Sequence, residues 1–551
     1  MNLYEKLTIG FGPGFGVGTD TLFNLKPTDR TGDFNVDRAD ADATEEISNG
    51  DFATDTVWSK GSGWSITGGK AVSTGAIGAL TQGSLSINAG EVYYVGVTTS
   101  GGSYSNGGLK VRLGGSSNLA QITEDGTFVF KLTAESDNVE FGLHVLANNA
   151  FNGSIDDVSV KSAEFLYAAT IVNADGLIEG VRPNVPRSNY PIGGSANGCP
   201  MLLCEPNVNN ELLQSEDLST SWTVNNSTVT TNASASPNGL TTADELIEDT
   251  STGTHDIRQF KSGLTNAVPY VFSVFAKANT RSKLRLNTFS GYAEFDISAG
   301  TVTSAPLVDE AIIEDYGNGW FRCSIVKTAN ATLTNSYIYI LNDAGSLSYT
   351  GDGTSGLYLW GATLYESDYV YSYVPTTTAE VTKQADEVNQ AGALADFNEE
   401  GVLIVDIAAL FDAGTNRKIS ISDGTTNNRL TIGYTGITNE VRVELFSGGL
   451  QTVGLIHTLS DATEFTLLGV RYKDNNVELW VNGGVATSDT SATVPNNKFN
   501  RINFDNGAGA DYFYGKCRML AYFNTYLTDE EMQYLILRGN FDFSDGNAFL
   551  F

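Results

Sequence analysis

The feature that most constrains this chain is a succession of short runs in which apolar and polar residues alternate with period two. Between residues 46 and 162 these include "EVYYVGVTT", "LKVRLGG", "TFVFKLTA" and "VEFGLHVLA", separated by turns rich in Gly, Asn and Ser. Runs of this length and spacing are typical of half-buried strands in a β-sandwich. No helix-period segment interrupts them, so the sequence predicts an all-β fold.

A second set of such runs follows between residues 211 and 367, and it begins and ends like the first. "ATEEISNGDFATDTVW" ends at Trp58 and "NNELLQSEDLSTSW" ends at Trp222; the closing strands are "NGSIDDVSVKS" and "SGLYLWGATLYES". We align Asn49-Gly50-Asp51 with Ser215-Glu216-Asp217, and Phe52 with Leu218. The repeat predicts two sandwich modules of one type, at 46–162 and 211–372.

A third β-rich stretch covers 393–539, where "KDNNVELWVNG" is a strong hairpin signal. Its one helical segment is "LTDEEMQYLIL", with Thr528 as the capping residue and acidic residues in the first turn. The remainder consists of ordered connectors at 22–45, 163–210 and 373–392, an N-terminal segment at 1–21 and an apolar tail at 540–551. We therefore expect three β-sandwich domains in series.

Charge and cysteine content exclude several classes of function. The chain has 32 Lys plus Arg against 64 Asp plus Glu, a formal charge of −32, which repels nucleic acid and anionic membranes. The four cysteines form no CxxC pair, and we expect free thiols. Neither a signal peptide nor an apolar run of membrane-spanning length is recognised, so we expect a soluble protein made in the cytoplasm.

Several segments resemble known families. "EEISNGDFATDTVW" with "GSIDDVSVKS" resembles the first and last strands of jelly-roll carbohydrate-binding modules. "ATIVNADGLIEGVRPNVPRSNYPIGGSANGCPMLLCEPNVNNELLQSEDLSTSW" resembles a segment of phage tail-fibre and head-fibre proteins, as does the connector "SYVPTTTAEVTKQAD". Residues 393–538 are similar to concanavalin A-like, laminin-G-like sandwiches.

One departure from the phage pattern concerns its order along the chain. "LFNLKPTDRTGDFNVDRADADAT" is similar to the front of that pattern, but the continuation "AATIVNADGLIE" comes only at residue 168. The first sandwich would then be an insertion. This hypothesis predicts that residues 22–45 and 163–210 form one composite unit.

A pair of carboxylates would indicate a glycosidase site, since such enzymes place two of them about 5–10 Å apart. Glu294 and Asp296 share a strand face at roughly 6.6 Å, whereas Glu440 and Glu444 are roughly 13 Å apart. The first pair has no His or Lys neighbour in sequence, and the three histidines are scattered over different modules. We predict no enzymatic activity and name no catalytic residue.

The jelly-roll resemblance implies a structural Ca²⁺ between the first turn and the last strand of the module. Asn49, Asp51, Asp156 and Asp157 occupy the matching positions in the first copy. In the second copy the closing strand supplies no acid. The alternative is that these aspartates are solvated residues at a strand edge.

Glycan binding requires exposed aromatic rings, so each candidate is judged by its surroundings. Trp58, Trp222, Trp320, Trp360 and Trp480 lie at positions expected to be core. Trp64 in "KGSGWSITGG" and Tyr104 in "SGGSYSNGG" are flanked by Gly and Ser, and we expect them to be exposed and to be the candidates for glycan contact.

Together these resemblances imply a phage virion protein, a fibre or a head or tail appendage that adheres to host cell-surface polysaccharide. Phe11 and Phe15 of the N-terminal segment would anchor it to other virion proteins, and adhesion favours a homo-oligomer, a trimer or a dimer. The alternatives are a purely structural decoration or adaptor protein without glycan binding and, less favoured, a polysaccharide depolymerase.

Overall fold

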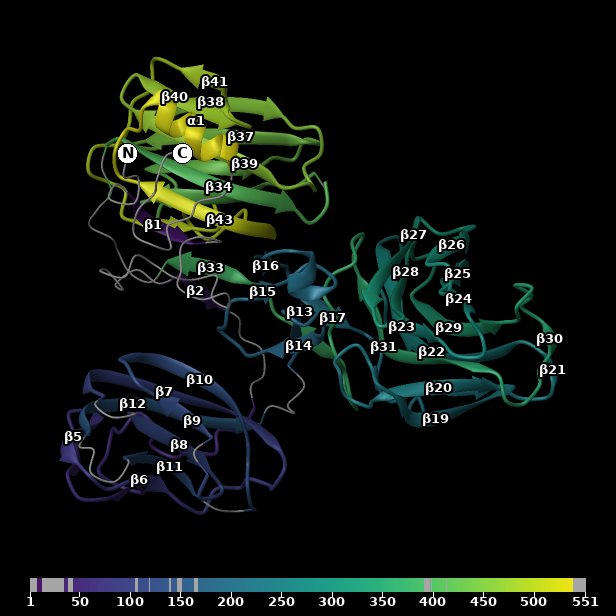
Figure 1. Cartoon of the computed structure of the whole chain (residues 1–551). Helices are drawn as coiled ribbons and strands as arrows, with labels where there is room; N and C mark the ends of the chain where they lie inside the picture. The colour runs from purple at the N-terminus through teal and green to yellow at the C-terminus, as the bar shows by residue number, and fades with distance from the viewer. Residues whose placement is uncertain are drawn as a thin grey trace. The chain divides into compact units, whose positions relative to one another are not determined.

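The computed structural model describes residues 7–11, 34–37, 43–104, 108–117, 119–137, 140–145, 151–162, 167–390, 397, 399–412 and 414–538. Residues 41–166 form one compact unit, and residues 1–40 with 167–551 form the other. The first unit is thus inserted into the second along the chain. Almost all regular structure is β, which confirms the predicted fold class (Figure 1).

The first unit is a sandwich of two five-stranded antiparallel sheets. One sheet has the order β10 (Gly126–Thr133), β7 (Val92–Ser103), β12 (Phe151–Ser162), β5 (Lys70–Ala76), β4 (Trp64–Thr67). The other has the order β3 (Ser59–Lys60), β6 (Leu80–Gln82), β11 (Phe141–Val145), β8 (Leu109–Leu113), β9 (Ala120–Ile122). Alternate residues of both sheets meet in one core around Val95, Val111 and Leu143.

The second sandwich has two six-stranded antiparallel sheets. One has the order β19 (Ser227–Ser234), β20 (Ala243–Glu248), β31 (Gly356–Glu366), β23 (Pro269–Ala278), β28 (Trp320–Thr328), β27 (Glu310–Gly317). The other has the order β18 (Thr223–Asn225), β22 (His255–Ser262), β29 (Leu333–Leu341), β24 (Lys283–Thr288), β25 (Gly291–Asp296), β26 (Thr301–Ser304).

These two sandwiches share one topology. In the first sheet of each sandwich, the last strand (β12 or β31) lies between an early hairpin and a central strand. The order β4-β5-β12-β7-β10 thus corresponds to β19-β20-β31-β23-β28. In the other sheet, β3-β6-β11-β8-β9 corresponds to β18-β22-β29-β24-β25. The second copy adds one edge strand to each sheet, β26 and β27, which are consecutive in sequence. The two sandwiches thus have the same strand order, as expected of two copies of one module.

The alignment of their first turns is corrected by one residue. The indole nitrogen of Trp58 donates to the carbonyl of Asn49 at 2.9 Å, and that of Trp222 donates to the carbonyl of Gln214 at 3.2 Å. The last strand reaches Gly50 in the first copy and Ser215 in the second, through backbone hydrogen bonds of 2.9 Å. Gln214 and Ser215 therefore correspond to Asn49 and Gly50, because the second copy is one residue shorter between turn and Trp.

The C-terminal sandwich has an eight-stranded and a seven-stranded sheet. The first has the order β15 (Ser188–Asn189), β16 (Met201–Cys204), β43 (Gly515–Phe523), β34 (Gly401–Ala409), β39 (Thr466–Lys473), β40 (Asn476–Val481), β41 (Gly484–Asp489), and β1 (Leu7–Phe11) also pairs with β43. The second has the order β2 (Phe34–Asp37), β33 (Glu387–Gln390), β42 (Arg501–Asn503), β35 (Arg417–Ser422), β36 (Arg429–Tyr434), β37 (Glu440–Ser447), β38 (Leu450–Thr458).

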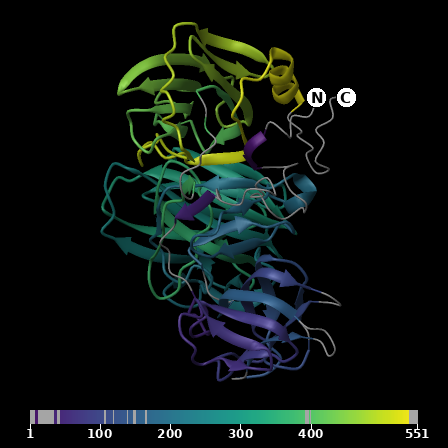
Figure 2. The ribbon, with the colours of Figure 1, turned by 90° about the vertical axis from the view of Figure 1, so that its left-hand side faces the viewer.

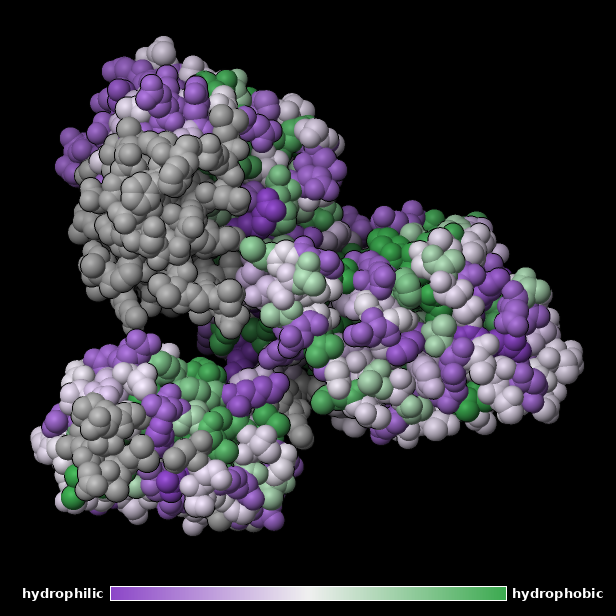
Figure 3. Space-filling model, viewed as in Figure 1, coloured by the Kyte–Doolittle hydropathy of each residue, from purple (hydrophilic) through white to green (hydrophobic). Residues whose placement is uncertain are grey.

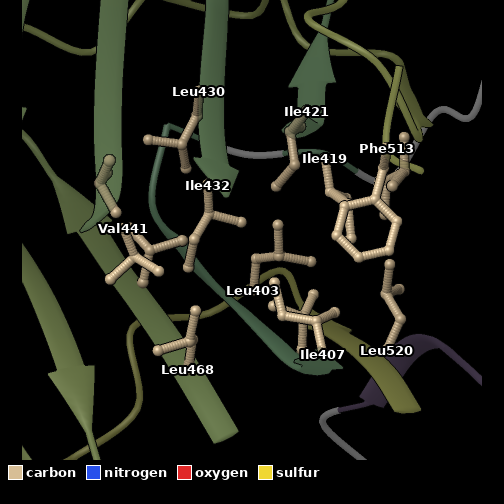
Figure 4. Close-up of a cluster of buried hydrophobic side chains, with 14 of the residues drawn as sticks. Leu403, Ile407, Ile419, Ile421, Leu430, Ile432, Val441, Leu468, Phe513 and Leu520 are labelled. Carbon is tan, nitrogen blue, oxygen red and sulfur yellow. The ribbon is translucent and has the colours of Figure 1, made fainter. Parts of the chain in front are cut away.

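Apolar side chains from both sheets meet in the core of this sandwich, where Leu403 and Leu468 face Ile432 and Val441 (Figure 4). Helix α1 (Asp529–Arg538), at the yellow end of the colour range, lies on the outside of the sandwich (Figure 2). Its apolar side packs on the eight-stranded sheet against Trp480. Its N-terminus is a capping box: Glu531 N–H donates to Thr528 Oγ1 at 3.3 Å, and Thr528 N–H donates to the Glu531 carboxylate at 2.7 Å. The predicted helix and its cap are confirmed.

The connectors form short pairings and a 3₁₀ turn, η2 (Gly194–Asn197). Their pairs are β13 (Ala169–Val172) with β14 (Ile178–Val181) and β17 (Val208–Asn210) with β32 (Val381–Lys383). A further short pair, β21 (Thr252–Gly253) with β30 (Tyr349–Thr350), belongs to the second sandwich. Residues 34–37 pair with residues 387–390, so this part of 22–45 meets the connector at 373–392 directly. The composite unit with 163–210 stays a prediction.

The predicted anchoring segment supplies an edge strand. Leu7–Phe11 pairs with β43, with Phe11 opposite Leu520. Phe15 and the tail at 540–551 lie outside the described residues, and virion anchoring by Phe11 and Phe15 stays a prediction.

Candidate functional site

The two aromatic residues predicted for glycan contact differ in exposure. Trp64 is only 8% exposed: its ring lies 5.7 Å from that of Phe151, and its indole nitrogen donates to the carbonyl of Gly78 at 2.9 Å. The prediction that Trp64 is exposed is wrong, because its Gly and Ser neighbours shape the turn while the ring points into the core.

Tyr104 keeps part of its ring at the surface. The ring packs 5.5 Å from Phe151, and the hydroxyl donates to the Asp125 carboxylate at 2.7 Å. Burial, aided by Asp125, raises the pKa of Tyr104 to about 12. Glycan contact by this half-buried residue stays a prediction.

The residues predicted to bind calcium lie where the first turn meets the last strand, which Gly50 and Val158 join by a backbone hydrogen bond. The Asn49 side chain is used within its own loop, donating to Thr54 O at 2.7 Å. Asp156 lies 3.6 Å from the Lys70 ammonium. Burial, followed by the charge of Asp156, raises the pKa of Asp157.

Carboxylates thus gather at the predicted position, but the described residues contain no group of three or more His, Cys, Asp or Glu side chains arranged to hold a metal ion. Calcium at Asn49, Asp51, Asp156 and Asp157 stays a prediction.

The carboxylates considered for catalysis are held in pairs with cations. Arg285 Nε donates to Glu294 at 3.0 Å, and Lys283 lies 3.8 Å from Asp296. Hydrogen bonds from Ser298 lower the pKa of Asp296. A general acid for glycoside cleavage needs a raised pKa, whereas the pKa of Asp296 is lowered.

The tryptophans predicted to be core are buried: Trp58, Trp222, Trp320, Trp360 and Trp480. On the surface of the second sandwich seen in Figure 3, hydrophilic and hydrophobic residues intermix. Hydropathy alone therefore does not mark a binding face on this surface.

Aromatic residues lie on the outer side of the sheet β18-β22-β29-β24-β25-β26. In β29, Ile338 and Ile340 point into the core, so Tyr337 and Tyr339 point outward. We call this outer side the tyrosine face and define it by its residues: Asn225, Asp256, Arg258, Arg285, Asn287, Tyr292, Glu294, Tyr337 and Tyr339.

Strand register places these residues in two rows. Tyr339 lies between Asp256 and Arg285, and Tyr337 lies between Arg258 and Asn287. Antiparallel neighbours on one face are close enough for their side chains to interact. The alternating strands therefore bring aromatic, cationic, amide and acidic groups onto one surface.

The two tyrosine rings form a stacked pair, with centroids 5.2 Å apart and planes 9° from parallel. The Arg258 guanidinium lies 5.5 Å from the Tyr337 ring centroid, and that of Arg285 lies 3.9 Å from the Tyr292 centroid. These cation–π contacts fix the arginines beside the rings.

Hydrogen bonds organise the polar groups of the face. Asp256 accepts from Asn225 at 3.0 Å and from Arg258 at 3.4 Å. Burial, followed by the charge of Asp256, raises the pKa of Tyr339, so its hydroxyl keeps its proton and can donate. Aromatic rings beside fixed donors and acceptors suit a ligand that has apolar faces and many hydroxyls.

Sequence reasoning missed this face. The signal was the alternation in "SYIYILND" and "SKLRLNTF", which predicted strands but not which strands are neighbours. The face exists only once the pairing register is known.

Comparison with known proteins gives fold likenesses only. No family model matches the chain, and no curated protein matches it. Among solved structures, the CBM40 module of a Ruminococcus gnavus IT-sialidase bound to α2,3-sialyllactose is similar at 13% identity and TM-score 0.23, over 26% of this chain and 84% of that one.

Two further likenesses are equally distant. A prokaryotic β-1,3-1,4-glucanase from a mouse hindgut metagenome has 16% identity and TM-score 0.21, over 27% of this chain and 74% of that one. The tandem CBM22 domains of Paenibacillus barcinonensis Xyn10C have 10% identity and TM-score 0.20, over 60% of this chain and 100% of that one. Likenesses at these TM-scores carry no argument about function, which rests on the side chains of the site.

A search of the described residues for a helix able to cross a bilayer finds none of sufficient length and apolarity.

Proposed function

We propose that this chain is a phage virion protein, a fibre or a head or tail appendage, that adheres to bacterial surface polysaccharide. The observation that carries glycan binding is the tyrosine face, a stacked aromatic pair within a sheet of fixed polar groups. The virion assignment is supported by the resemblance of the 168–222 segment and of the connector after residue 371 to phage fibre proteins.

In this mechanism a sugar ring lies on the Tyr337–Tyr339 pair, while Arg258, Asn287 and Asp256 exchange hydrogen bonds with its hydroxyls. Each contact is weak. A homo-oligomer, a trimer or a dimer, on one particle would raise the overall avidity by roughly 10²–10⁴ when several faces bind at once. Other virion proteins would hold the oligomer on the particle.

The test is a glycan array probed with the full-length protein and with Tyr337→Ala. We expect the variant to lose about fivefold or more in apparent affinity, since an aromatic contact is worth about 1 kcal/mol or more. The matched control is Tyr512→Ala, which removes one ring of another stacked pair, Tyr512 and Tyr514, on the C-terminal sandwich. If the wild type and both variants bound glycan equally well, the glycan-binding site would lie outside the tyrosine face. If the folded wild type bound no glycan on the array, a purely structural appendage would be favoured.

A further inference from the structure

The aromatic surface of the second sandwich continues beyond the tyrosine face. In β22, Phe260 follows Arg258 on the outward side of the sheet, and strand register places it opposite Asn335, two residues before Tyr337 in β29. Phe260 is 58% exposed, and Leu333, the outward residue of β29 before Asn335, is 50% exposed. The outer side of the sheet is therefore accessible to solvent at this end of the two strands.

Aromatic side chains thus occupy three successive levels of the sheet, those of Asn335, Tyr337 and Tyr339, with Phe260 at the first level. Alternate residues of a strand are about 6.6 Å apart, so the row from Phe260 to Tyr339 spans about 13 Å. Diagonal neighbours on adjacent strands, such as Phe260 and Tyr337, are close enough for one ligand to touch both. The row is longer than one pyranose ring, so a ligand that covers it must contain several linked sugars.

Tyr292 is also outward but is not part of the row. It lies on β25, opposite Asn287 of β24, and the Arg285 guanidinium covers one face of its ring, 3.9 Å from the centroid. The row therefore follows β22 and β29 and does not cross the sheet.

The row also reaches exposed residues at its other end. Beyond Tyr339, β29 ends at Leu341, which lies beside Lys283 of β24. The side chain of Lys283 is 27% exposed, and that of Asp343, just after the strand, is 79% exposed. A chain lying along the row can therefore continue past both Phe260 and Tyr339.

The charged groups on this side of the sheet balance one another. Each cation among the outward strand residues is paired with a carboxylate: Arg258 with Asp256 at 3.4 Å, Arg285 with Glu294, and Lys283 with Asp296 at 3.8 Å. These groups cancel in formal charge. The whole chain carries a formal charge of −32, which repels polyanions. Both observations favour an uncharged ligand over an acidic one.

Polar groups beside the row can hold sugar hydroxyls. Arg258 donates to Asp256 through one terminal nitrogen, and 33% of its side chain is exposed, so its other N–H groups can donate to a ligand. Asn335 and Asn287 are half-buried outward amides, and Asn287 lies opposite Tyr337. Amides both donate and accept, so each supplies polar contacts next to a ring.

We infer that the tyrosine face binds the interior of a linear, uncharged polysaccharide, with Phe260 as a further binding residue. Consecutive sugar rings lie against Tyr339, Tyr337 and Phe260, and the chain continues past both ends of the row. This inference rests on the proposed binding of glycan by the tyrosine face, and it adds the length, the charge and the mode of contact of the ligand.

The test measures binding of the full-length protein to soluble, largely linear polysaccharides: lichenan, glucomannan, pullulan and dextran, with polygalacturonate as the acidic control. We expect at least one neutral polymer to bind more tightly than polygalacturonate. Calorimetry and ultracentrifugation should then find more protein assemblies on each polymer chain than the chain has ends. Binding at chain ends only, equal or tighter binding of polygalacturonate, or binding of none of the neutral polymers would overturn the inference.

Variants test the length of the site with the disaccharide and the hexasaccharide of the polymer that binds. Phe260→Ala should weaken hexasaccharide binding about fivefold through the loss of one aromatic contact, with a smaller effect on the disaccharide, which can occupy Tyr337 and Tyr339 alone. Tyr337→Ala should weaken both. If Phe260→Ala bound the hexasaccharide as tightly as the wild type, Phe260 would not belong to the site.

Leu240→Ala is the matched control for Phe260→Ala. Leu240 is 59% exposed, as Phe260 nearly is, but it lies between β19 and β20 of the other sheet of the same sandwich. This variant should bind both oligosaccharides as the wild type does. Weakening by Leu240→Ala equal to that by Phe260→Ala would overturn the assignment of Phe260.

Failure of this inference and failure of glycan adhesion give different results. If the glycan array detects binding that Tyr337→Ala weakens, while the polymers bind only through their ends, glycan adhesion stands and binding of the chain interior is overturned. If the folded protein binds neither the array nor any polymer, glycan adhesion itself fails.

Discussion

The first two sandwiches have the same strand order but different outer surfaces. On the sheet that corresponds to the tyrosine face, Gly142 lies between Thr81 and Arg112, and His144 lies opposite Lys110. A Cβ on Gly142 would come within 2.6 Å of the His144 ring, so only glycine leaves room for that imidazole. The second copy has Tyr337 and Tyr339 on the corresponding strand.

This difference teaches that topology and binding surface are separately determined. The core residues of β11 and β29 must fill the same kind of space, so both are apolar at alternate positions. Their outward residues pack against no second sheet and are free to differ. The first copy carries Arg112 and the buried Lys110 on this side of its sheet, and the second carries aromatic rings.

The largest expected effect tests whether the two cores are equivalent. Trp58→Ala and Trp222→Ala each remove a buried ring that caps the first turn, and each should lower the free energy of unfolding by about 3–5 kcal/mol. Hydrogen exchange should show lost protection in 43–162 for the first variant and in 208–374 for the second. If one variant unfolded with the same free energy as the wild type, the two tryptophans would not have equivalent roles in the two cores.

The next effect distinguishes the first turns. With the corrected alignment, Glu216 corresponds to Asp51, but it lies among aromatic residues, where its carboxylate accepts from Tyr373 at 3.0 Å. Burial raises the pKa of Glu216 to about 7 against hydrogen bonds from Tyr373 and Trp360. In the unfolded chain this pKa is near 4.5, so stability falls as pH rises from about 4.5 to 7.

Glu216→Gln should therefore leave stability unchanged at pH 4 and raise it above pH 7 by as much as about 3 kcal/mol. Denaturant unfolding followed across this pH range measures the effect. Asp51→Asn, at the exposed corresponding position, serves as the control. A wild-type protein whose stability rises between pH 5 and 7 relative to the Gln variant would contradict the assignment.

The smallest expected effect concerns calcium. The jelly-roll resemblance implies Ca²⁺ at Asn49, Asp51, Asp156 and Asp157 of the first sandwich, whereas the closing strand of the second copy supplies no acid. At about 100 times its dissociation constant, the ion would stabilise the first sandwich by about 2.7 kcal/mol, and chelation would remove this. Calorimetry of the wild-type protein with Ca²⁺ and with chelator measures this difference in stability. The transition of the Asp157→Asn variant should be the same under the two conditions. If the wild-type transition were also the same under the two conditions, the first sandwich would lack an ion, like the second.

The sequence predicted what depends on local pattern. Alternation placed Trp360 and Trp480 in cores, and the Thr528 cap marked the start of the helix. It missed the direction of the Trp64 ring, since Gly and Ser neighbours determine backbone shape only. It also missed the tyrosine face, because this face depends on strands that are distant in sequence, such as β22 and β29, and one sequence does not give strand register.

The strand β43 has a consequence for how the protein is made. It pairs with β16 through residues 515–517 and with β1 through residues 520–523, so a single edge binds segments some 300 and 500 residues earlier in the chain. Strand pairing over such sequence separations is slow, whereas the 41–166 unit is one continuous segment of the chain. During synthesis the inserted sandwich can fold as soon as it leaves the ribosome, while β1 and β16 wait for almost the entire chain.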